Sequence, residues 1–210
     1  MIRDIAEAAR KASRKLAVLS SAAKDTSLRH MAETLRHHAT YLQEENARDL
    51  ETAHATGLSP AMIDRLTLSE KVIEGMARGM EEIAELPDPV GRITGMARRP
   101  NGLVVGRMRI PLGVVAIIYE SRPNVTADAA ALCLKSGNAV ILRGGSEAIH
   151  SNAAIVTILR ESLRSTGIDP EAVGFIPIAH RQARTDMLRM EDLIDLGIPR
   201  GGEGVITTVS

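Results

Sequence analysis

The spacing of hydrophobic positions divides the chain into three parts. Over residues 1–86 apolar side chains recur every three or four positions, the period of a helix with one buried face. The first such run is Ile2–Leu19 and the second, longer one is Leu28–Leu42, so the sequence predicts one helix in each. We expect this helical lead to be a structural layer that packs on the rest of the molecule.

Two further helix starts lie in the same region. Ser59 precedes Pro60, the arrangement of an N-cap followed by proline at the first helical position. Thr67 and Glu70 have the spacing of a capping box, and Pro87-Asp88-Pro89 would end the helix that follows. The sequence therefore predicts helices that begin after Ser59 and after Thr67.

The pattern changes between residues 90 and 110, where short apolar runs flank Asn101-Gly102. Asn-Gly between strand-like runs is the strongest short-range signal for a β-hairpin. The hairpin would carry several arginines, which either discourage pairing of its edges with other strands or take part in binding. These are Arg92, Arg98, Arg99, Arg107 and Arg109.

From residue 111 onward short apolar runs alternate with helical periods. Strands are predicted at 113–119, 139–142, about 173–178 and about 193–198, with helices at 125–136, 147–165, 181–189 and 205–209. This alternation predicts an α/β fold with a parallel sheet and right-handed crossovers.

Composition narrows the classes of function. Zero formal net charge and only two Tyr and one Phe disfavour a nucleic-acid-binding protein, which needs basic patches or stacking rings. The amino-terminal sequence has no apolar segment of signal-peptide length, and no run approaches the roughly 20 apolar residues of a membrane helix. We therefore expect a cytoplasmic protein with neither a nucleic-acid nor a membrane partner.

The residues after the 139–142 strand are candidates for a binding site, because ligands of parallel sheets sit outside the carboxyl ends of the strands. They are Arg143, Gly144, Gly145, Ser146 and Glu147. Glycines permit positive φ and allow a ligand to approach the backbone closely. The next helix would offer free N–H groups to a phosphate, and the arginine would bind a phosphate through a forked contact. A plain tight turn with a surface arginine explains them equally well, since the full dinucleotide glycine motif is absent.

A second glycine turn, Gly201-Gly202, follows the last predicted strand. In a parallel sheet the two turns would lie at the same edge. Together they favour nucleotide binding more than either turn does alone.

The loop after the 113–119 strand holds Glu120, Arg122 and Asn124. The first two either bind a charged substrate or pair with each other. The amide of Asn124 has the chemistry to stabilise an oxyanion, but the residues alone favour an N-cap, a role that asparagine performs very often.

Neither thiol nor metal chemistry is indicated. Cys133, the single cysteine, lies among apolar helix residues, so we interpret it as a core residue with a protonated thiol. An intrachain disulfide is then impossible. The six histidines show no metal-ligand spacing, and we expect no metal site.

Three segments resemble the gamma-glutamyl phosphate reductase family of the aldehyde dehydrogenase superfamily. They are YESRPNVT at 119–126, SGNAVILRGGSEA at 136–148 and IDLGIPRGGEGVI at 194–206. The resemblance implies an aldehyde-dehydrogenase-like α/β fold, with the helical lead 1–86, an oligomerisation arm at 90–110 and a Rossmann-like region at 111–210. It also implies an enzyme of proline biosynthesis that uses NADPH to reduce gamma-glutamyl phosphate to glutamate 5-semialdehyde.

Family roles are carried over by position. Asn124 takes the place of an asparagine that stabilises an oxyanion, and Arg143 that of a residue that holds the adenosine ribose, in a turn suited to a 2′-phosphate. Gly201-Gly202 matches a glycine turn near the pyrophosphate. The resemblance also implies cofactor binding by Gly144, Gly145, Ser146 and Glu147, and substrate binding by Glu120 and Arg122.

The chain departs from this family in length, since family members are about twice as long. Their nucleophilic cysteine lies in sequence that would follow Ser210. We therefore expect residues 1–210 to form an incomplete cofactor-binding domain without the catalytic domain, and to have negligible reductase activity alone. The alternative is a non-catalytic nucleotide-binding or assembly module.

Overall fold

A parallel sheet of four strands lies at the centre of the computed structural model, which describes residues 1–178 and 181–201. The strands are β3 (Val114–Ile118), β4 (Ala139–Arg143), β5 (Val173–Phe175) and β6 (Leu196–Pro199), in the order β5-β4-β3-β6. Every residue of β3 and β4 is buried, which explains the uninterrupted apolar runs 114–118 and 139–142. Because β3 lies between β4 and β6, the strand order reverses beside β3.

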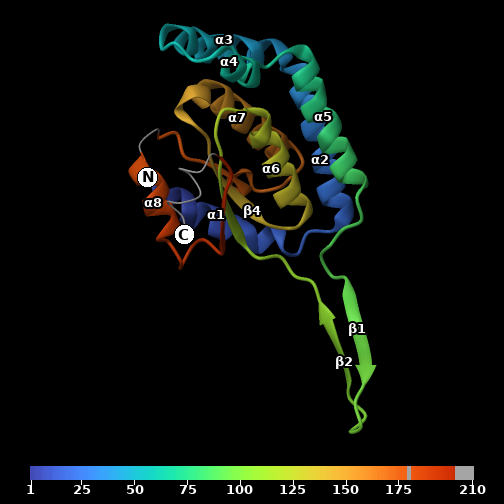
Figure 1. The fold of residues 1–210 in the computed structure, drawn as a ribbon. Helices are drawn as coiled ribbons and strands as arrows, with labels where there is room; N and C mark the ends of the chain where they lie inside the picture. The colour runs from blue at the N-terminus through green and yellow to red at the C-terminus, as the bar shows by residue number, and fades with distance from the viewer. Residues whose placement is uncertain (179–180, 202–210) are drawn as a thin grey trace.

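Helices cover both faces of this sheet (Figure 1). On one face lie α1 (Ile2–Leu16) and α8 (Arg181–Leu188), and on the other lie α6 (Asn124–Lys135) and α7 (Ile149–Ser165). Outside α6 and α7, a further layer is formed by α2 (Ser21–His37) and α5 (Glu70–Glu85). Most buried apolar side chains of the described residues form one continuous core through these layers.

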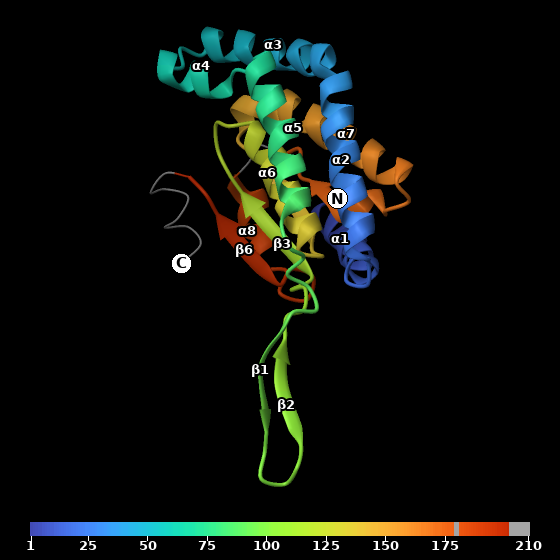
Figure 2. The same ribbon diagram turned by 90° about the vertical axis from the view of Figure 1, so that its right-hand side faces the viewer.

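Two more helices, α3 (Ala39–Ala55) and α4 (Pro60–Leu66), lie beyond the carboxyl ends of the strands (Figures 1 and 2). Short 3-10 turns at Ser146–Ala148 and Pro170–Ala172 complete the crossovers. The helical lead therefore reaches the edge of the sheet where sequence analysis expected ligands.

The hairpin consists of antiparallel strands β1 (Ile93–Arg98) and β2 (Val104–Met108), and this prediction is confirmed. Gly102 in its turn has φ of +88°, a conformation that favours glycine. All residues of both strands are exposed. The hairpin projects from the body at the end opposite α3 and α4 (Figures 1 and 2).

Two predictions for the helical lead are wrong. The single helix through Leu28–Leu42 is divided, because α2 ends at His37 and α3 begins at Ala39. The apolar spacing continues across the break because both helices bury one face, but α2 packs on α5 and α7 whereas α3 packs on α7 and α4. The capping box is replaced by Ser69, whose hydroxyl accepts from the Val72 N–H at 3.3 Å.

Other boundaries differ less. Ser59 does occupy the capping position before Pro60. The 193–198 strand begins later, at Leu196 in β6, and the 173–178 strand is shorter. The helix predicted at 205–209 lies outside the described residues.

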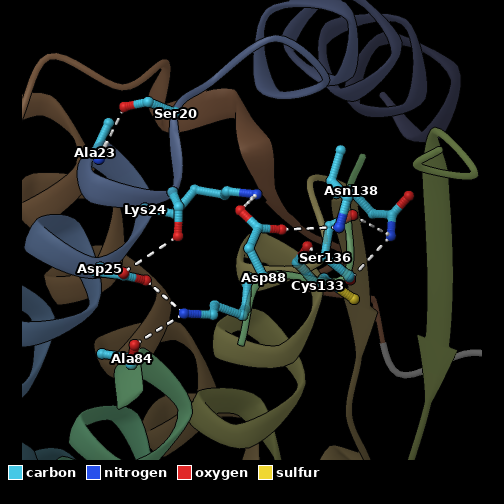
Figure 3. A network of polar contacts seen from close by, with 12 residues as sticks. Ser20, Ala23, Lys24, Asp25, Ala84, Asp88, Cys133, Ser136 and Asn138 are labelled. Atoms are coloured by element: carbon cyan, nitrogen blue, oxygen red, sulfur yellow. Dashed lines mark hydrogen bonds and ion pairs between the residues drawn. The ribbon is translucent and has the colours of Figure 1, made fainter. Parts of the chain in front are cut away.

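Two buried lysines join the helical lead to the base of the hairpin (Figure 3). Lys24 of α2, with 1% of its side chain exposed, forms an ion pair with Asp88, which also accepts from the Val90 N–H at 2.9 Å. Lys135 of α6 donates to Asp25 at 2.5 Å and to the Ala84 carbonyl at 2.8 Å. Lys24 thereby fixes the segment that enters the hairpin to α2, and Lys135 joins α6 to α2 and α5 beside it.

Candidate functional site

The candidate site lies at the carboxyl edge of the sheet. Ile118 at the end of β3 is in register with Arg143 of β4 on one side and with Pro199 of β6 on the other. The loops after all three strands therefore leave the sheet at the same edge. Gly144, Gly145 and Gly201 lie in these loops as the sequence predicts, and Gly202 lies outside the described residues.

The first pocket, of about 560 Å³, lies between the turn after β4 and helices α3 and α4. Arg143 lines it and has only 7% of its surface exposed, so its interpretation as a surface arginine is wrong. The other lining residues come from both sides of the pocket: Thr52, Thr56, Leu58, Met62, Glu120, Ser121, Gly145, Ser146 and Glu147.

The second pocket, of about 370 Å³, lies between the ends of β3 and β6, where the strand order reverses. Such a reversal is the usual ligand position in open parallel sheets. Its lining residues are Arg65, Tyr119, Glu120, Ser121, Arg122, Val125, Arg200 and Gly201. Both pockets share Glu120 and Ser121, so the loop after β3 forms the wall between them.

This wall is held in place by Glu147. The Ser121 N–H donates to the Glu147 carboxylate at 2.6 Å and the Ser121 hydroxyl donates to the same oxygen at 2.9 Å. Ser121 has φ of +53° and is the one non-glycine residue with positive φ among those that the structure describes. Residues other than glycine adopt this backbone conformation at a cost in free energy, and such strained residues cluster at functional sites.

The glycines after β4 serve close packing and not an unusual backbone conformation. Neither Gly144 nor Gly145 has positive φ, so the backbone freedom that glycine permits is not used in this turn. A Cβ on Gly144 would lie 2.1 Å from Nδ2 of Asn152, and a Cβ on Gly145 would lie 2.2 Å from the Glu147 carboxylate. Gly145 therefore leaves the room that Glu147 needs to reach Ser121.

The amino terminus of α7 is not free to bind a phosphate, contrary to the prediction. The buried carboxylate of Asp49, from α3, accepts from the His150 N–H at 3.1 Å and from the Ser151 N–H at 2.8 Å. It also accepts from the Ser151 hydroxyl at 2.6 Å. Because Asp49 lies far earlier in the chain, no local pattern indicated this cap.

Asn124 is not an N-cap. Pro123 occupies the capping position, and Asn124 is the first residue of α6, with its amide 3.5 Å from the Asp128 carboxylate. Burial raises the pKa of Asp128, against the opposing effects of Arg200 and of this amide. Asn124 lines neither of the two pockets.

A buried hydrogen-bond chain that sequence analysis missed supports the end of β3. The Thr126 hydroxyl donates to Oδ1 of Asn152 at 2.8 Å, so the Tyr119 hydroxyl, 2.6 Å away, donates to Thr126. Burial raises the pKa of Tyr119, which keeps the phenol protonated. Since Asn152 packs on Gly144, this chain fixes the two strand ends relative to each other.

The structure also shows the surroundings of Cys133 and of the pair Glu120 and Arg122. Cys133 is buried in the core, and burial raises the pKa of its thiol to about 12, so its interpretation as a core residue is confirmed. Glu120 and Arg122 form no ion pair in the part of the chain that the structure describes.

No metal site or membrane helix is found in the same part of the chain. Within residues 1–178 and 181–201 no group of His, Cys, Asp or Glu is arranged to hold a metal ion. None of the described helices has the length and apolar composition needed to cross a bilayer.

Several lining residues belong to the helical lead, which is therefore more than the structural layer that the sequence indicated. Thr52 of α3, Thr56 just after the end of α3 and Met62 of α4 line the first pocket. Arg65 of α4 lines the second pocket. The helical spacing of apolar residues predicted helices in this region but gave no sign that they would line a pocket. Their contribution depends on contacts between distant segments, which no local pattern shows.

The fold and this site define a class of protein. Residues 1–195 match the aldehyde dehydrogenase family, and the chain belongs to that family of oxidoreductases, which use nicotinamide cofactors and act on small-molecule substrates. A solved protein from Listeria monocytogenes EGD-e, named a probable aldehyde dehydrogenase, has the same fold: it matches with 18% identity and a TM-score of 0.77 over 99% of this chain and 43% of that one.

Within the family the chain is similar to gamma-glutamyl phosphate reductases. It is 60% identical to that of Geobacter sp. (strain M21) over 99% of its own length and 50% of the relative's. The solved gamma-glutamyl phosphate reductase of Thermotoga maritima matches with 39% identity and a TM-score of 0.97, covering 99% of this chain and 50% of that one. The chain thus spans about half the length of the relatives it matches.

Proposed function

We propose that this chain provides the cofactor-binding part of a gamma-glutamyl phosphate reductase. The reaction reduces gamma-glutamyl phosphate with NADPH to glutamate 5-semialdehyde, releases phosphate, and belongs to proline biosynthesis. The observation that carries the proposal is the pocket at the carboxyl edge with buried Arg143 in its lining, in a chain 60% identical to such reductases.

The first pocket has the groups that a phosphorylated ribose requires. A guanidinium binds phosphate through forked hydrogen bonds, which suits Arg143 to the 2′-phosphate that distinguishes NADPH from NADH. Ser146, Thr52 and Thr56 add hydroxyl groups to the same lining. Gly145 and Glu147 shape the pocket wall, and Gly144 admits Asn152 beneath the turn. When bound, NADPH supplies a hydride.

The second pocket suits the acyl substrate and the part of the cofactor that lies next to it. We assign Glu120 and Arg122, which line it, to substrate binding, and Gly201-Gly202 to the turn near the pyrophosphate. Asn124, in the adjoining turn of α6, would donate its amide to the oxyanion that forms as the acyl group is attacked. That role requires the amide to leave Asp128, a contact that is already long at 3.5 Å.

The chain's own thiol takes no part in this scheme. Cys133 is the single cysteine of the 210 residues, and its burial and raised pKa keep it a protonated core residue. We therefore propose that residues 1–210 bind the ligands but do not turn them over by themselves. The same observation favours the second candidate, a non-catalytic nucleotide-binding or assembly module. Reductase turnover above a buffer blank by the purified chain would contradict both.

Self-association through the hairpin is part of the proposal. Both strands of the arm at 90–110 are exposed and carry apolar side chains, a surface that a second copy would cover. We also propose a cytoplasmic location, which rests on the metabolic role.

Titration of the purified chain with NADPH and NADH tests the cofactor assignment. Replacing Arg143 by alanine is expected to weaken NADPH binding about tenfold or more, the effect of losing a forked charged contact, and to change NADH binding little. Equal losses for both nucleotides, or no loss for NADPH, would contradict the assignment. Because Arg143 is buried, circular dichroism must first show that the variant is folded.

A further inference from the structure

The second pocket brings together three guanidinium groups that are distant in sequence. Arg65 comes from α4 in the helical lead, Arg122 from the loop after β3 and Arg200 from the loop after β6. Glu120 is the one carboxylate in the lining of this pocket. The formal charge of the lining is therefore strongly positive, although the protein as a whole has zero formal net charge.

All three arginines are exposed, and Arg200 also acts electrostatically on the half-buried carboxylate of Asp128. Other arginines form ion pairs across the structure, such as Arg36 with Glu74 and Arg10 with Asp195. Among residues 1–178 and 181–201, no ion pair or side-chain hydrogen bond is found for Arg65, Arg122 or Arg200. Like charges that face one pocket repel one another, and a bound anion would relieve that repulsion.

A buried amide holds the backbone next to Arg65. Asn46 of α3 donates to the Leu66 carbonyl at 2.9 Å and to the Ser151 hydroxyl at 3.0 Å, and its oxygen accepts from the Leu68 N–H at 2.8 Å. These bonds tie the end of α4, next to Arg65, to the start of α7. The helical lead is thereby held against the sheet edge at the point where it contributes its arginine.

We propose that Arg65, Arg122 and Arg200 form an anion site that binds a phosphoryl group. Planar guanidinium groups are the side chains best matched to phosphate oxygens, and several of them can share one dianion. The neighbouring first pocket, with Arg143, is separated from this site by the Ser121 loop. Two phosphate positions on either side of one wall suit a pair of phosphorylated ligands, or one ligand with two phosphate groups.

The phosphoryl group has two possible sources, and only the choice between them rests on the proposed function. It is either the phosphate that leaves the acyl substrate or the pyrophosphate of the dinucleotide. Both present the same oxygens to the arginines. The site itself can be tested with inorganic phosphate and pyrophosphate, without activity or a nucleotide.

Calorimetric titration of the chain with pyrophosphate and with phosphate tests the site. Arg65→Gln and Arg200→Gln are each expected to weaken binding about tenfold, as for loss of one charged hydrogen-bonding group. Arg14→Gln is the matched control, since it removes an exposed arginine from α1 on the other face of the sheet. Absence of binding by the unaltered chain, or unchanged affinity in both variants, would overturn the proposal.

Adding NADPH separates the two sources. If the site takes the dinucleotide pyrophosphate, NADPH displaces pyrophosphate and Arg65→Gln weakens NADPH binding as well. If it takes the substrate phosphate, phosphate still binds at saturating NADPH and Arg65→Gln leaves NADPH affinity unchanged. Either result supports the anion site. Loss of pyrophosphate binding in Arg65→Gln, with NADPH affinity unchanged in Arg143→Ala, would retain the site and reject the proposed cofactor assignment.

Discussion

Ser121 shows how a single residue shapes this edge of the sheet. Two hydrogen bonds to Glu147 compensate the cost of its positive φ, and the resulting wall divides the two pockets. The carboxylate reaches the wall because residue 145 has no side chain. Glu147 therefore acts on the site through Ser121 in addition to lining the first pocket.

Replacing Glu147 by alanine tests this role. The variant leaves the Ser121 N–H without its acceptor, so we expect the free energy of unfolding to fall by about 1.5–3 kcal/mol, the range for a hydrogen bond to a charged group. Urea denaturation measures the loss. Glu147→Gln retains an acceptor oxygen and should lose less, and equal stability of Glu147→Ala and the unaltered chain would contradict the role.

Cys133 gives a chemical test at the same scale. With its pKa raised to about 12 by burial, the thiol is almost entirely protonated near neutral pH. We expect alkylation by iodoacetamide at pH 8 to be very slow in the folded chain and to become fast in denaturant. Mass spectrometry follows the modification, and rapid labelling of the folded chain would show a reactive thiolate.

The sequence pointed to those pocket-lining residues that follow strands, and it missed residues that reach this edge from distant segments. Arg143 and Gly201 were found because polar turns after buried runs indicate the carboxyl edge of a sheet. Asp49 caps α7 from α3, and Arg65 enters the second pocket from α4. Both contacts join segments far apart in sequence, and a helical surface position carries no sign of them.

Among elements, the central strands β3 and β4 were predicted to within one residue at each end, because buried runs bounded by turn residues leave few alternatives. The break at His38 was not predicted, since both α2 and α3 keep an apolar face and no proline or glycine separates them. The start of α5 was misplaced because Thr67 and Ser69 are equally plausible caps from sequence. The neighbouring turn decided between them: the Thr67 hydroxyl donates to the Ile63 carbonyl.

The lysine network at the base of the hairpin yields a prediction for element packing. Asp88→Asn removes the partner of buried Lys24, and we expect a loss of about 3 kcal/mol at pH 7, because an unpaired buried charge is costly. Burial raises the pKa of Asp88, but Lys24, the Val90 N–H and Lys135 together lower it below its usual value.

The pH dependence of this loss follows from that lowered pKa. The ionised Asp88 stabilises the fold fully above its unfolded pKa of about 4, and the stabilisation disappears as pH falls through the lower folded pKa. The difference between Asp88→Asn and the unaltered chain should therefore shrink in strong acid, as measured by urea denaturation at several pH values. Asp4→Asn, at an exposed site, should have little effect, and a pH-independent difference for Asp88→Asn would contradict the explanation.

The hairpin gives the second prediction for an element. If it mediates self-association, Val104→Asp, at a position 54% exposed on β2, should shift the sedimentation coefficient toward that of a monomer, because burying an unpaired carboxylate is unfavourable. Val18→Asp introduces the same change at a position 83% exposed outside the hairpin and should have no effect. An unchanged coefficient in Val104→Asp would reject association through this surface.

At the scale of the whole molecule, the two proposed roles lie at opposite ends of the body. The carboxyl edge of the sheet, covered by α3 and α4, gathers the glycine turns, Arg143 and the three arginines of the second pocket. The hairpin leaves from the opposite end and is fixed there by the lysine network (Figures 2 and 3). We therefore expect substitutions at one end to leave the role proposed for the other end unchanged.

Hydrogen exchange of the chain with and without saturating NADPH tests most directly that the dinucleotide binds at the carboxyl edge. We predict slower exchange in residues 119–122 and 143–148, which form the pocket walls, with no change in the hairpin strands at 93–98 and 104–108. Binding of NADPH with protection elsewhere, and none in those loops, would contradict the account.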